Sequence, residues 1–159
     1  MSQEAKIKAS LTNKFSFLAD SINIVRPRRV SIEVGLENFI AVFAYLAKEL
    51  QFSHLCTITG LDEQENLGFI YHLAGEGGIM MNLKTSVAKS NPVIQSVTAY
   101  FPGAEIYERE LVDLFGAKVE GLAAGHRYPL TDDWPQDQHP LRKDWKPDPG
   151  TEKGGSGNA

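Results

Sequence analysis

Two periodicities of hydrophobic and polar residues divide the first hundred positions into helices and strands. Apolar residues recur every three or four positions up to about Leu18, and again from Leu36 to Leu50. This spacing places apolar side chains on one face of a helix. We therefore predict two amphipathic helices. Their apolar faces consist of Ile7, Leu11, Phe15 and Leu18 in the first, and Leu36, Phe39, Ile40, Phe43, Leu46 and Leu50 in the second.

The residues between and after these helices have the pattern of β-strands. Residues 21–34 alternate in a β-like way with a break at Pro27, and three further strand candidates cover residues 53–62, 67–75 and 79–87. The connections at 62–66 and 76–78 are short and have the composition of hairpin turns. A short helix is predicted at 93–100, because Asn91-Pro92 is a favourable cap and first-turn pair.

The stretch 101-FPGAEIYERELVDLFG-116 predicts the last helix, which ends at Gly116 as a left-handed C-cap. Together these elements indicate an α+β fold. It consists of a small mixed, largely antiparallel sheet with packed helices, followed by an extended proline-rich C-terminal tail. We expect a globular α+β domain over residues 1–116, an extended partner-binding segment over 117–150 and a disordered tail over 151–159.

The composition changes after Gly116. Five of the eight prolines lie in the last 31 residues, a density that excludes regular helix and most sheet. The same region holds more large apolar side chains than a disordered linker usually contains; they are Tyr128, Leu130, Trp134, Leu141 and Trp145. An extended segment with aromatic anchors is typical of a chain that lies across a partner. The alternative is a tail folded back over its own domain.

Charge and cysteine content argue against several classes of protein. A net charge of -4 and an isoelectric point near 5.6 argue against a nucleic-acid-binding protein, which is usually basic. Cys56, the single cysteine, cannot form an internal disulfide or hold an iron–sulfur cluster alone. No secretory signal is recognisable, and the longest apolar run, 39–47, is shorter than the about 20 residues of a membrane span. We expect a cytosolic chain, or one that sits on a membrane complex without entering the bilayer.

The helix predicted at 101–116 carries four acids and one arginine. On a helical wheel Glu108 and Glu110 flank an apolar stripe from opposite sides. Arg109 lies on the far side, four positions from Glu105 and from Asp113, at spacings that favour weak ion pairs. Paired carboxylates can perform acid–base catalysis only where they converge in a cleft, and these two diverge. The helical wheel therefore favours a role of these two carboxylates in orienting the helix. The apolar stripe consists of Tyr107, Leu111, Leu114 and Phe115.

Two further groups of residues in the tail have potential chemistry. His126 and His139 flank three aspartates, but their spacing matches no compact set of metal ligands; the aspartates are Asp132, Asp133 and Asp137. The segment 139-HPLRKDW-145 combines charges that can pair with apolar anchors, and Arg and Trp are enriched at interface hot spots. The second group therefore predicts a contact surface, through Leu141, Arg142, Lys143, Asp144 and Trp145.

These stretches together resemble the 30-kDa (C) subunit family of respiratory complex I and its hydrogenase relatives. The family signature is an ERE-x-x-D-x-x-G helix, a downstream His with an Arg nearby, and an HPLRKD ending. The match extends over about residues 107–145, with Trp134 in the intervening DDW. The matching residues are Glu108, Arg109, Glu110, Asp113, Gly116, His126, Arg127, His139, Pro140, Leu141, Arg142, Lys143 and Asp144, followed by Trp145.

The resemblance implies a cofactor-free structural subunit of a membrane-bound, energy-converting redox complex, peripheral on the cytoplasmic side of the membrane. Its partners would be the large hydrogenase-like (49-kDa-type) subunit and a neighbouring iron–sulfur subunit. Those subunits would carry the nickel–iron centre and the iron–sulfur clusters. The chain would contact neither nucleic acid nor, except through the complex, the membrane.

The branch of the family is inferred from the spacer before the last motif. His126 is followed directly by Arg127-Tyr128-Pro129, which resembles the versions in energy-converting hydrogenases and formate hydrogenlyases. The alternatives are the 30-kDa subunit of a complex I-type NADH:quinone oxidoreductase, a stand-alone acid–base enzyme using Glu108 and Glu110, and a metal-dependent protein using His126 and His139. In the structural-subunit interpretation, we expect Glu108 or Glu110 to pair with the basic cluster Arg142–Lys143 or with basic groups on the large subunit.

Overall fold

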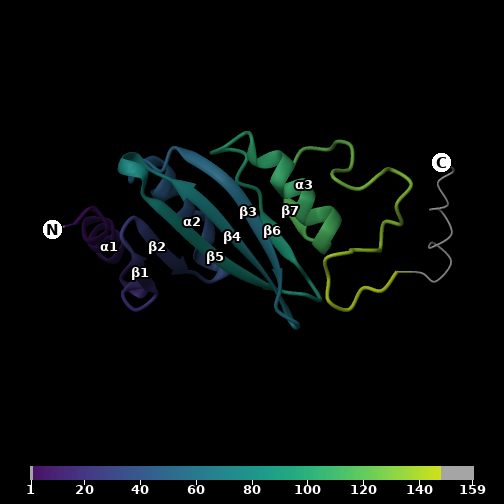
Figure 1. Cartoon of the computed structure of the whole chain (residues 1–159), viewed down its shortest axis with the longest axis horizontal. Helices are drawn as coiled ribbons and strands as arrows, with labels where there is room; N and C mark the ends of the chain where they lie inside the picture. The colour runs from purple at the N-terminus through teal and green to yellow at the C-terminus, as the bar shows by residue number, and fades with distance from the viewer. Residues whose placement is uncertain (1, 148–159) are drawn as a thin grey trace, which may run out of the picture.

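Five strands form the central sheet of the structure, a computed structural model that describes residues 2–147. In spatial order they are β1 (Ile22–Arg26), β2 (Arg29–Glu33), β5 (Met80–Ala88), β4 (Asn66–Ala74) and β3 (His54–Asp62). The pairing of β2 with β5 is parallel, and the three other pairings are antiparallel (Figure 1). The predicted mixed, largely antiparallel sheet is therefore confirmed, including both hairpins on either side of β4.

Three α-helices accompany the sheet: α1 (Gln3–Lys14), α2 (Leu36–Lys48) and α3 (Ala104–Phe115). Each lies where the apolar periodicity predicted a helix. Short 3-10 turns follow α1 at Ser16–Leu18 and connect β4 to β5 at Glu76–Gly78. The α+β fold class is thus confirmed, because the apolar stripes of the helices and one face of the sheet are buried against each other.

Helices α2 and α3 pack on the same side of the sheet. The rings of Phe39 and Phe43 in α2 lie 4.8 and 5.5 Å from the ring of Tyr71 in β4. The ring of Phe115 in α3 occupies the space that a Cβ on Gly60 would need. Since Gly60 pairs with Phe69, two residues before Tyr71, this contact lies on the face that α2 covers.

The opposite face of the sheet carries polar side chains. His72 lies between Thr59 and Asn82, with its Nε2 2.9 Å from the Thr59 hydroxyl and its Nδ1 2.9 Å from Asn82 Oδ1. An antiparallel sheet commonly has one face on the core and one polar face. His72 is accordingly part of a hydrogen-bonded row across three strands.

The prediction of a helix at 93–100 is wrong. Residues Val93–Gln95 form β6, which pairs in parallel with β7 (Lys118–Glu120), and a turn follows. The backbone N–H of Lys118 donates to the carbonyl of Pro92 (2.8 Å), so this segment is fixed in an extended conformation by β7. The sequence offered a good helix start at Asn91-Pro92, but the pairing with β7, 25 positions away, prevailed.

Within residues 121–147, which we call the C-terminal arm, the structure describes neither helix nor strand. Strand β7 lies beyond the domain boundary predicted at residue 116 and pairs with β6 of the domain. The division into a domain and a partner-binding segment remains a prediction. The tail predicted over 151–159 lies outside the described residues.

Candidate functional site

Helix α3 is the base of the candidate site, and its two ends are set by glycines. Gly103 precedes its first residue, and Gly116 follows its last with φ of +70°, the left-handed conformation predicted for it. Leu111 and Phe115 of the predicted apolar stripe are buried, and Tyr107 and Leu114 pack against the same core. The charged side chains of α3 are then left for polar contacts; they are Glu105, Glu108, Arg109, Glu110 and Asp113.

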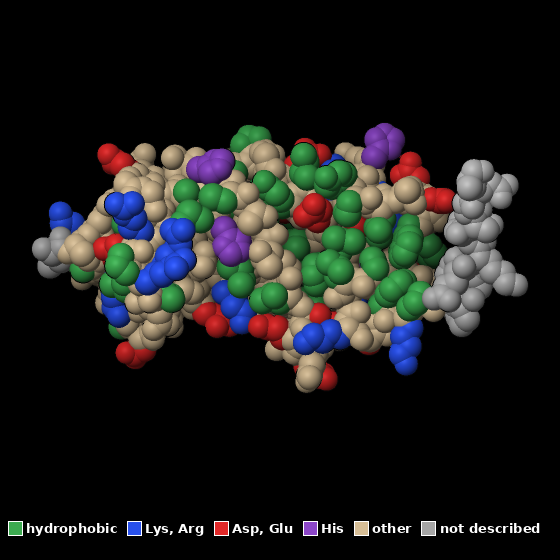
Figure 2. Space-filling model, in the orientation of Figure 1, with side chains coloured by type: hydrophobic (Ala, Val, Ile, Leu, Met, Phe, Trp, Pro, Cys, Tyr) green, Lys and Arg blue, Asp and Glu red, His purple; other side chains and the backbone are tan. Residues whose placement is uncertain are grey.

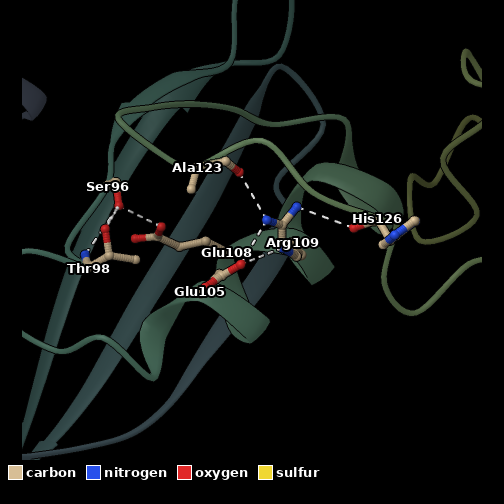
Figure 3. Close-up of polar contacts among 7 residues, drawn as sticks. All are labelled: Ser96, Thr98, Glu105, Glu108, Arg109, Ala123 and His126. Atoms are coloured by element: carbon tan, nitrogen blue, oxygen red, sulfur yellow. Dashed lines mark hydrogen bonds and ion pairs between the residues drawn. The ribbon is translucent and has the colours of Figure 1, made fainter.

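Glu108, predicted to flank the apolar stripe, has a fully buried side chain. Its carboxylate accepts hydrogen bonds from the backbone N–H of Val97 (2.6 Å) and the hydroxyl of Ser96 (2.7 Å). Figure 3 shows the side chain directed toward Ser96. Burial raises the pKa of this carboxyl, against the opposing effect of the two hydrogen bonds. Glu108 therefore fixes the loop after β6, and its predicted pairing with Arg142 or Lys143 is wrong within this chain.

Arg109 connects α3 to the first part of the arm. Its guanidinium donates to the carboxylate of Glu105 and to the carbonyls of Ala123 (2.9 Å) and His126 (3.2 Å) (Figure 3). The predicted pair with Glu105 is confirmed. The predicted pair with Asp113 is wrong, because Asp113 has turned to a residue of the arm.

Asp113 is 4% exposed and holds the middle of the arm. One carboxylate oxygen accepts from Arg127 Nε (3.1 Å) and the other from the backbone N–H of Leu130 (3.2 Å). Arg127 in turn donates to the carbonyl of Trp134 (2.6 Å). Glu108, Arg109 and Asp113 of the helix motif thus contact three different parts of the fold.

The segment 139-HPLRKDW-145 completes the C-terminus of α3. The last carbonyls of a helix have no partner within it, and three consecutive ones accept hydrogen bonds from this segment. His139 Nδ1 donates to the carbonyl of Asp113 (2.9 Å), the backbone N–H of Leu141 to Leu114 (3.1 Å), and Arg142 Nε to Phe115 (2.6 Å). The position of Arg142 also agrees with the preference for cations at helix C-termini.

Gly116 makes this close approach possible. A Cβ on Gly116 would lie 2.5 Å from the His139 ring and 2.8 Å from Arg142 Nη2. The helix motif and the HPLRKD motif, 23 residues apart between Gly116 and His139, are therefore one structural unit.

A buried aspartate outside both motifs secures the end of the segment. Asp62, at the end of β3, accepts from the backbone N–H of Lys143 (2.8 Å) and pairs with Lys89 (2.7 Å), which also pairs with Asp144 (3.0 Å). Burial acts to raise the pKa of Asp62, but hydrogen bonds from Lys89, Lys143 and Gln64 prevail and lower it to about 2. The sequence analysis missed both residues: it placed Asp62 only at a strand end and turn, and it assigned Lys89 to no element.

The other predicted residues lie on the outer side of this unit. Trp134 and Trp145 are half-buried neighbours with ring centroids 6.1 Å apart, and both indole N–H groups donate to Gln138. Leu141 is 52% exposed, the side chain of Lys143 is exposed, and Pro140 is half-buried. Glu110 is half-buried, and among the described residues its side chain has no hydrogen-bond or ion-pair partner.

The metal interpretation gains no support from the geometry. His139 uses its ring to bond the Asp113 carbonyl, whereas His126 contributes only its backbone carbonyl to Arg109. In residues 2–147 no group of three or more His, Cys, Asp or Glu side chains is placed to hold a metal ion. The same residues contain no helix that is long and apolar enough to cross a membrane.

Comparison with known proteins gives a consistent result over most of the chain. Residues 32–151 match the family model described as respiratory-chain NADH dehydrogenase, 30 Kd subunit. The C subunit of the F(420)H(2) dehydrogenase of Methanosarcina mazei is 32% identical over 140 residues, which are 86% of this chain and 88% of that protein. The C subunit of the NADH-quinone oxidoreductase of Moorella thermoacetica is 31% identical over 73% of this chain and 79% of its own length.

A hydrogenase component and two solved structures are also similar. Hydrogenase-4 component G of Escherichia coli is 35% identical over 126 residues, which are 74% of this chain but 22% of that protein. A chain in the structure of the membrane-bound sulfane sulfur reductase, an archaeal respiratory membrane complex, has a TM-score of 0.79 at 27% identity. The match covers 91% of this chain and 86% of that one. The trypsin-resistant fragment of Nqo5 shares the fold, with a TM-score of 0.61 at 22% identity over 74% of this chain and 99% of the fragment.

Proposed function

The chain belongs to the family of 30-kDa subunits of the respiratory-chain NADH dehydrogenase, and from this we propose that it is a non-catalytic assembly subunit. Its relatives are subunits of oxidoreductase complexes. The complex proposed here is membrane-bound and energy-converting, and the chain occupies a peripheral position on its cytoplasmic side. Its docking partner is the large hydrogenase-like (49-kDa-type) subunit, with an iron–sulfur subunit as neighbour.

The observation that carries this proposal is the way the arm divides its polar and apolar groups. The polar groups of the HPLRKD segment bond to α3 and Asp62, whereas Leu141 is 52% exposed and Tyr128 46% exposed. Ile106 of α3 is exposed as well, and Figure 2 shows hydrophobic side chains gathered over the end of the molecule that carries α3 and the arm. An ordered surface with exposed large apolar groups suits a protein–protein interface.

The carboxylates of α3 support a structural role over acid–base catalysis. Glu108 bonds the loop after β6, Glu105 bonds Arg109, and Asp113 bonds the arm. General acid–base catalysis needs carboxyl groups that converge on a substrate. Of the two carboxylates in the acid–base alternative, Glu108 is fully buried against the loop after β6, whereas Glu110 is half-buried and has no hydrogen-bond or ion-pair partner among the described residues. A stand-alone enzyme is therefore the weaker hypothesis.

We further propose that the chain carries no cofactor and that the redox centres belong to its partners. A nickel–iron centre in the large subunit would define a hydrogenase or formate-hydrogenlyase type of complex. The sequence His126-Arg127-Tyr128-Pro129 and the similarity to a hydrogenase component favour this type. The second candidate is a quinone-linked NADH dehydrogenase, which the similarity to NADH-quinone oxidoreductase subunits favours.

Co-purification of the tagged full-length chain from its native host tests the docking. We expect Tyr128→Asp/Leu141→Asp to reduce the amount of bound large subunit at least about tenfold, since charges would enter an apolar interface. The control is Leu36→Asp, at a residue 41% exposed at the start of α2. Wild-type amounts of large subunit on the double variant would contradict the proposal.

Metal and cofactor analysis of the wild-type complex separates the two candidates. Nickel bound to the large subunit identifies the hydrogenase type. Flavin with quinone-linked activity and no nickel identifies the dehydrogenase. A metal or flavin bound stoichiometrically to the isolated chain would contradict the proposal that this subunit is cofactor-free.

A further inference from the structure

Positive charge is concentrated at the end of the molecule opposite the arm. The first 30 residues contain six Lys or Arg and two acids, in a chain whose net charge is -4. Figure 2 shows Lys and Arg side chains gathered over this end, where α1, β1 and β2 lie. In the described part of the chain none of the six forms an ion pair. They are Lys6, Lys8, Lys14, Arg26, Arg28 and Arg29.

The turn between β1 and β2 holds one of these arginines in an unusual conformation. Arg28 has φ of +62°, in the left-handed region where glycine is the favoured residue. Its backbone N–H donates to the carboxylate of Glu4 in α1 (2.6 Å), which fixes the turn. The Arg28 side chain itself donates no hydrogen bond to any of the described residues. A strained backbone position that keeps a large cationic side chain indicates a task for that side chain.

Strand β1 adds apolar groups beside the arginines. It is an edge strand of the sheet, and its pairing with β2 shifts between Ile24 and Arg26, so Val25 forms a bulge. Bulges redirect side chains, and Val25 is 65% exposed, beside Ile24 at 43%. Exposed β-branched side chains directly beside Arg26 and Arg28 form a mixed apolar and basic surface.

Resting on the complex proposed above, we propose that this surface, residues 23–28, docks on an acidic surface of one neighbouring subunit other than the large subunit. Arginine guanidinium groups bind carboxylates with two parallel hydrogen bonds, and the apolar side chains between them can be buried in the same contact. The surface precedes the residues matched by the family model and lies at the other end of the fold from the arm. It is therefore a second contact, independent of the docking proposed for Leu141 and Tyr128.

The charge and shape of the surface select a protein partner. A second copy of the chain would bring arginine against arginine, which like-charge repulsion disfavours. Membrane-surface segments use long amphipathic helices with Trp, Phe or Leu as anchors, whereas this surface is a short strand with Val25 and Ile24. Charge and a bulge on an edge strand also discourage sheet-to-sheet aggregation, but that function alone requires neither a left-handed arginine nor an exposed valine.

Photo-cross-linking in the purified native complex identifies the occupant. A benzoylphenylalanine at Val25 is expected to cross-link to one other subunit, at a peptide rich in Asp or Glu. The same probe at Lys118, an exposed strand residue near the opposite end, is the control and is expected not to reach that peptide. Cross-links from Val25 to lipid or to a second copy of the chain, or none, would overturn the proposal.

Charge reversal measures the strength of the contact. Arg26→Glu/Arg28→Glu is expected to reduce retention of the cross-linked subunit by about tenfold at low salt, and the difference from the wild type is expected to shrink at higher salt, because salt screens the charges. The large subunit should remain bound through the arm, and Lys118→Glu should behave as wild type. Circular dichroism and thermal unfolding of the purified variants confirm that they fold. Unchanged retention of every subunit by the folded double variant would refute the proposal.

Discussion

The carboxylate of Asp62 accepts a hydrogen bond of 2.8 Å from the backbone N–H of Lys143, 81 positions later in the chain. This contact joins the end of β3 to the HPLRKD segment. Lys89 strengthens the connection, because it pairs with Asp62 and with Asp144 of the segment. The HPLRKD segment of the arm is therefore held at two places, on the C-terminal carbonyls of α3 and on Asp62. A segment without helix or strand thereby gains a defined position on the domain.

Replacing Asp62 should release the end of the arm. Asp62→Asn removes the charge that Lys89 and Lys143 contact, and we expect a loss of roughly 1–3 kcal/mol in the free energy of unfolding. Hydrogen exchange of the amides at 141–145 should accelerate most. The control is Glu63→Gln, because Glu63 pairs with Lys84 at the surface and exposed pairs contribute little. Unchanged exchange at Lys143 in Asp62→Asn would contradict this account.

The same contact predicts a response to acid. The pKa of Asp62 in the folded protein is lowered to about 2, below the value near 4 of an unfolded aspartate. Its stabilisation is therefore fully present above about pH 4 and is lost as the pH falls toward 2. The NMR shift of the Lys143 amide should titrate in this window. The transition should disappear in Asp62→Asn; its persistence there would assign it to another group.

Glu108 predicts the opposite dependence on pH. Burial raises its pKa above the ordinary value, so the folded state holds this proton more tightly than the unfolded state. Its contribution to stability should fall as the pH rises from the unfolded pKa through the folded one. Glu108→Gln keeps an acceptor for Val97 and should remove this part of the dependence. Urea unfolding at a series of pH values measures the difference between the two proteins.

The contrast between two substitutions at Glu108 tests its structural role. Glu108→Ala leaves the buried N–H of Val97 without an acceptor and creates a cavity, which should cost roughly 2–4 kcal/mol. Glu108→Gln should cost clearly less. Equal losses in the two variants would mean that the hydrogen bond to Val97 contributes nothing.

Gly116 predicts a steric effect on the arm. A side chain there would be strained at φ of +70° and would collide with His139 and Arg142. We expect Gly116→Ala to destabilise the protein by roughly 1–3 kcal/mol. Gly103→Ala is the matched control, because φ is -65° and no atom lies within 4 Å of the new methyl group. It should change stability by less than about 0.5 kcal/mol.

We expect arginine and lysine at position 109 to differ in how well they order the first part of the arm. A lysine cannot reproduce the geometry of the contacts to Glu105, Ala123 and His126. Arg109→Lys should therefore accelerate hydrogen exchange over residues 121–127 by about tenfold, corresponding to about 1.4 kcal/mol. Arg26→Lys, at an exposed residue without such contacts, is the control. Equal protection in both variants would mean that Arg109 does not order this part of the arm.

The charged positions of α3 show where sequence reasoning reached its limit. The wheel identified the buried stripe and the pair of Arg109 with Glu105, which are local consequences of helical geometry. It placed Glu108 at the edge of the stripe, where we expected pairing with Arg142 or Lys143, and Asp113 beside Arg109, because it had no information about the partners from outside the helix. Ser96 and Val97 occupy the side toward Glu108, and Arg127 draws Asp113 away.

The concentration of basic residues in the first 30 positions was missed for a different reason. The net charge of -4 described the whole chain as acidic, although six Lys and Arg and only two acids lie in this stretch. The uneven charge is legible in the sequence, whereas the exposure of Arg26 and Arg28 on an edge strand is decided by the fold.

The sequence by itself determined the three α-helices, the five strands of the central sheet, the left-handed cap at Gly116 and membership of the family. Apolar periodicity and glycine at a helix end act over a few residues, so they are legible in the chain. Only the tertiary structure decided that residues 93–95 form a strand, that Glu108 is buried and that HPLRKD caps α3. Each of these depends on a hydrogen-bond partner far away in sequence, which folding alone brings within reach.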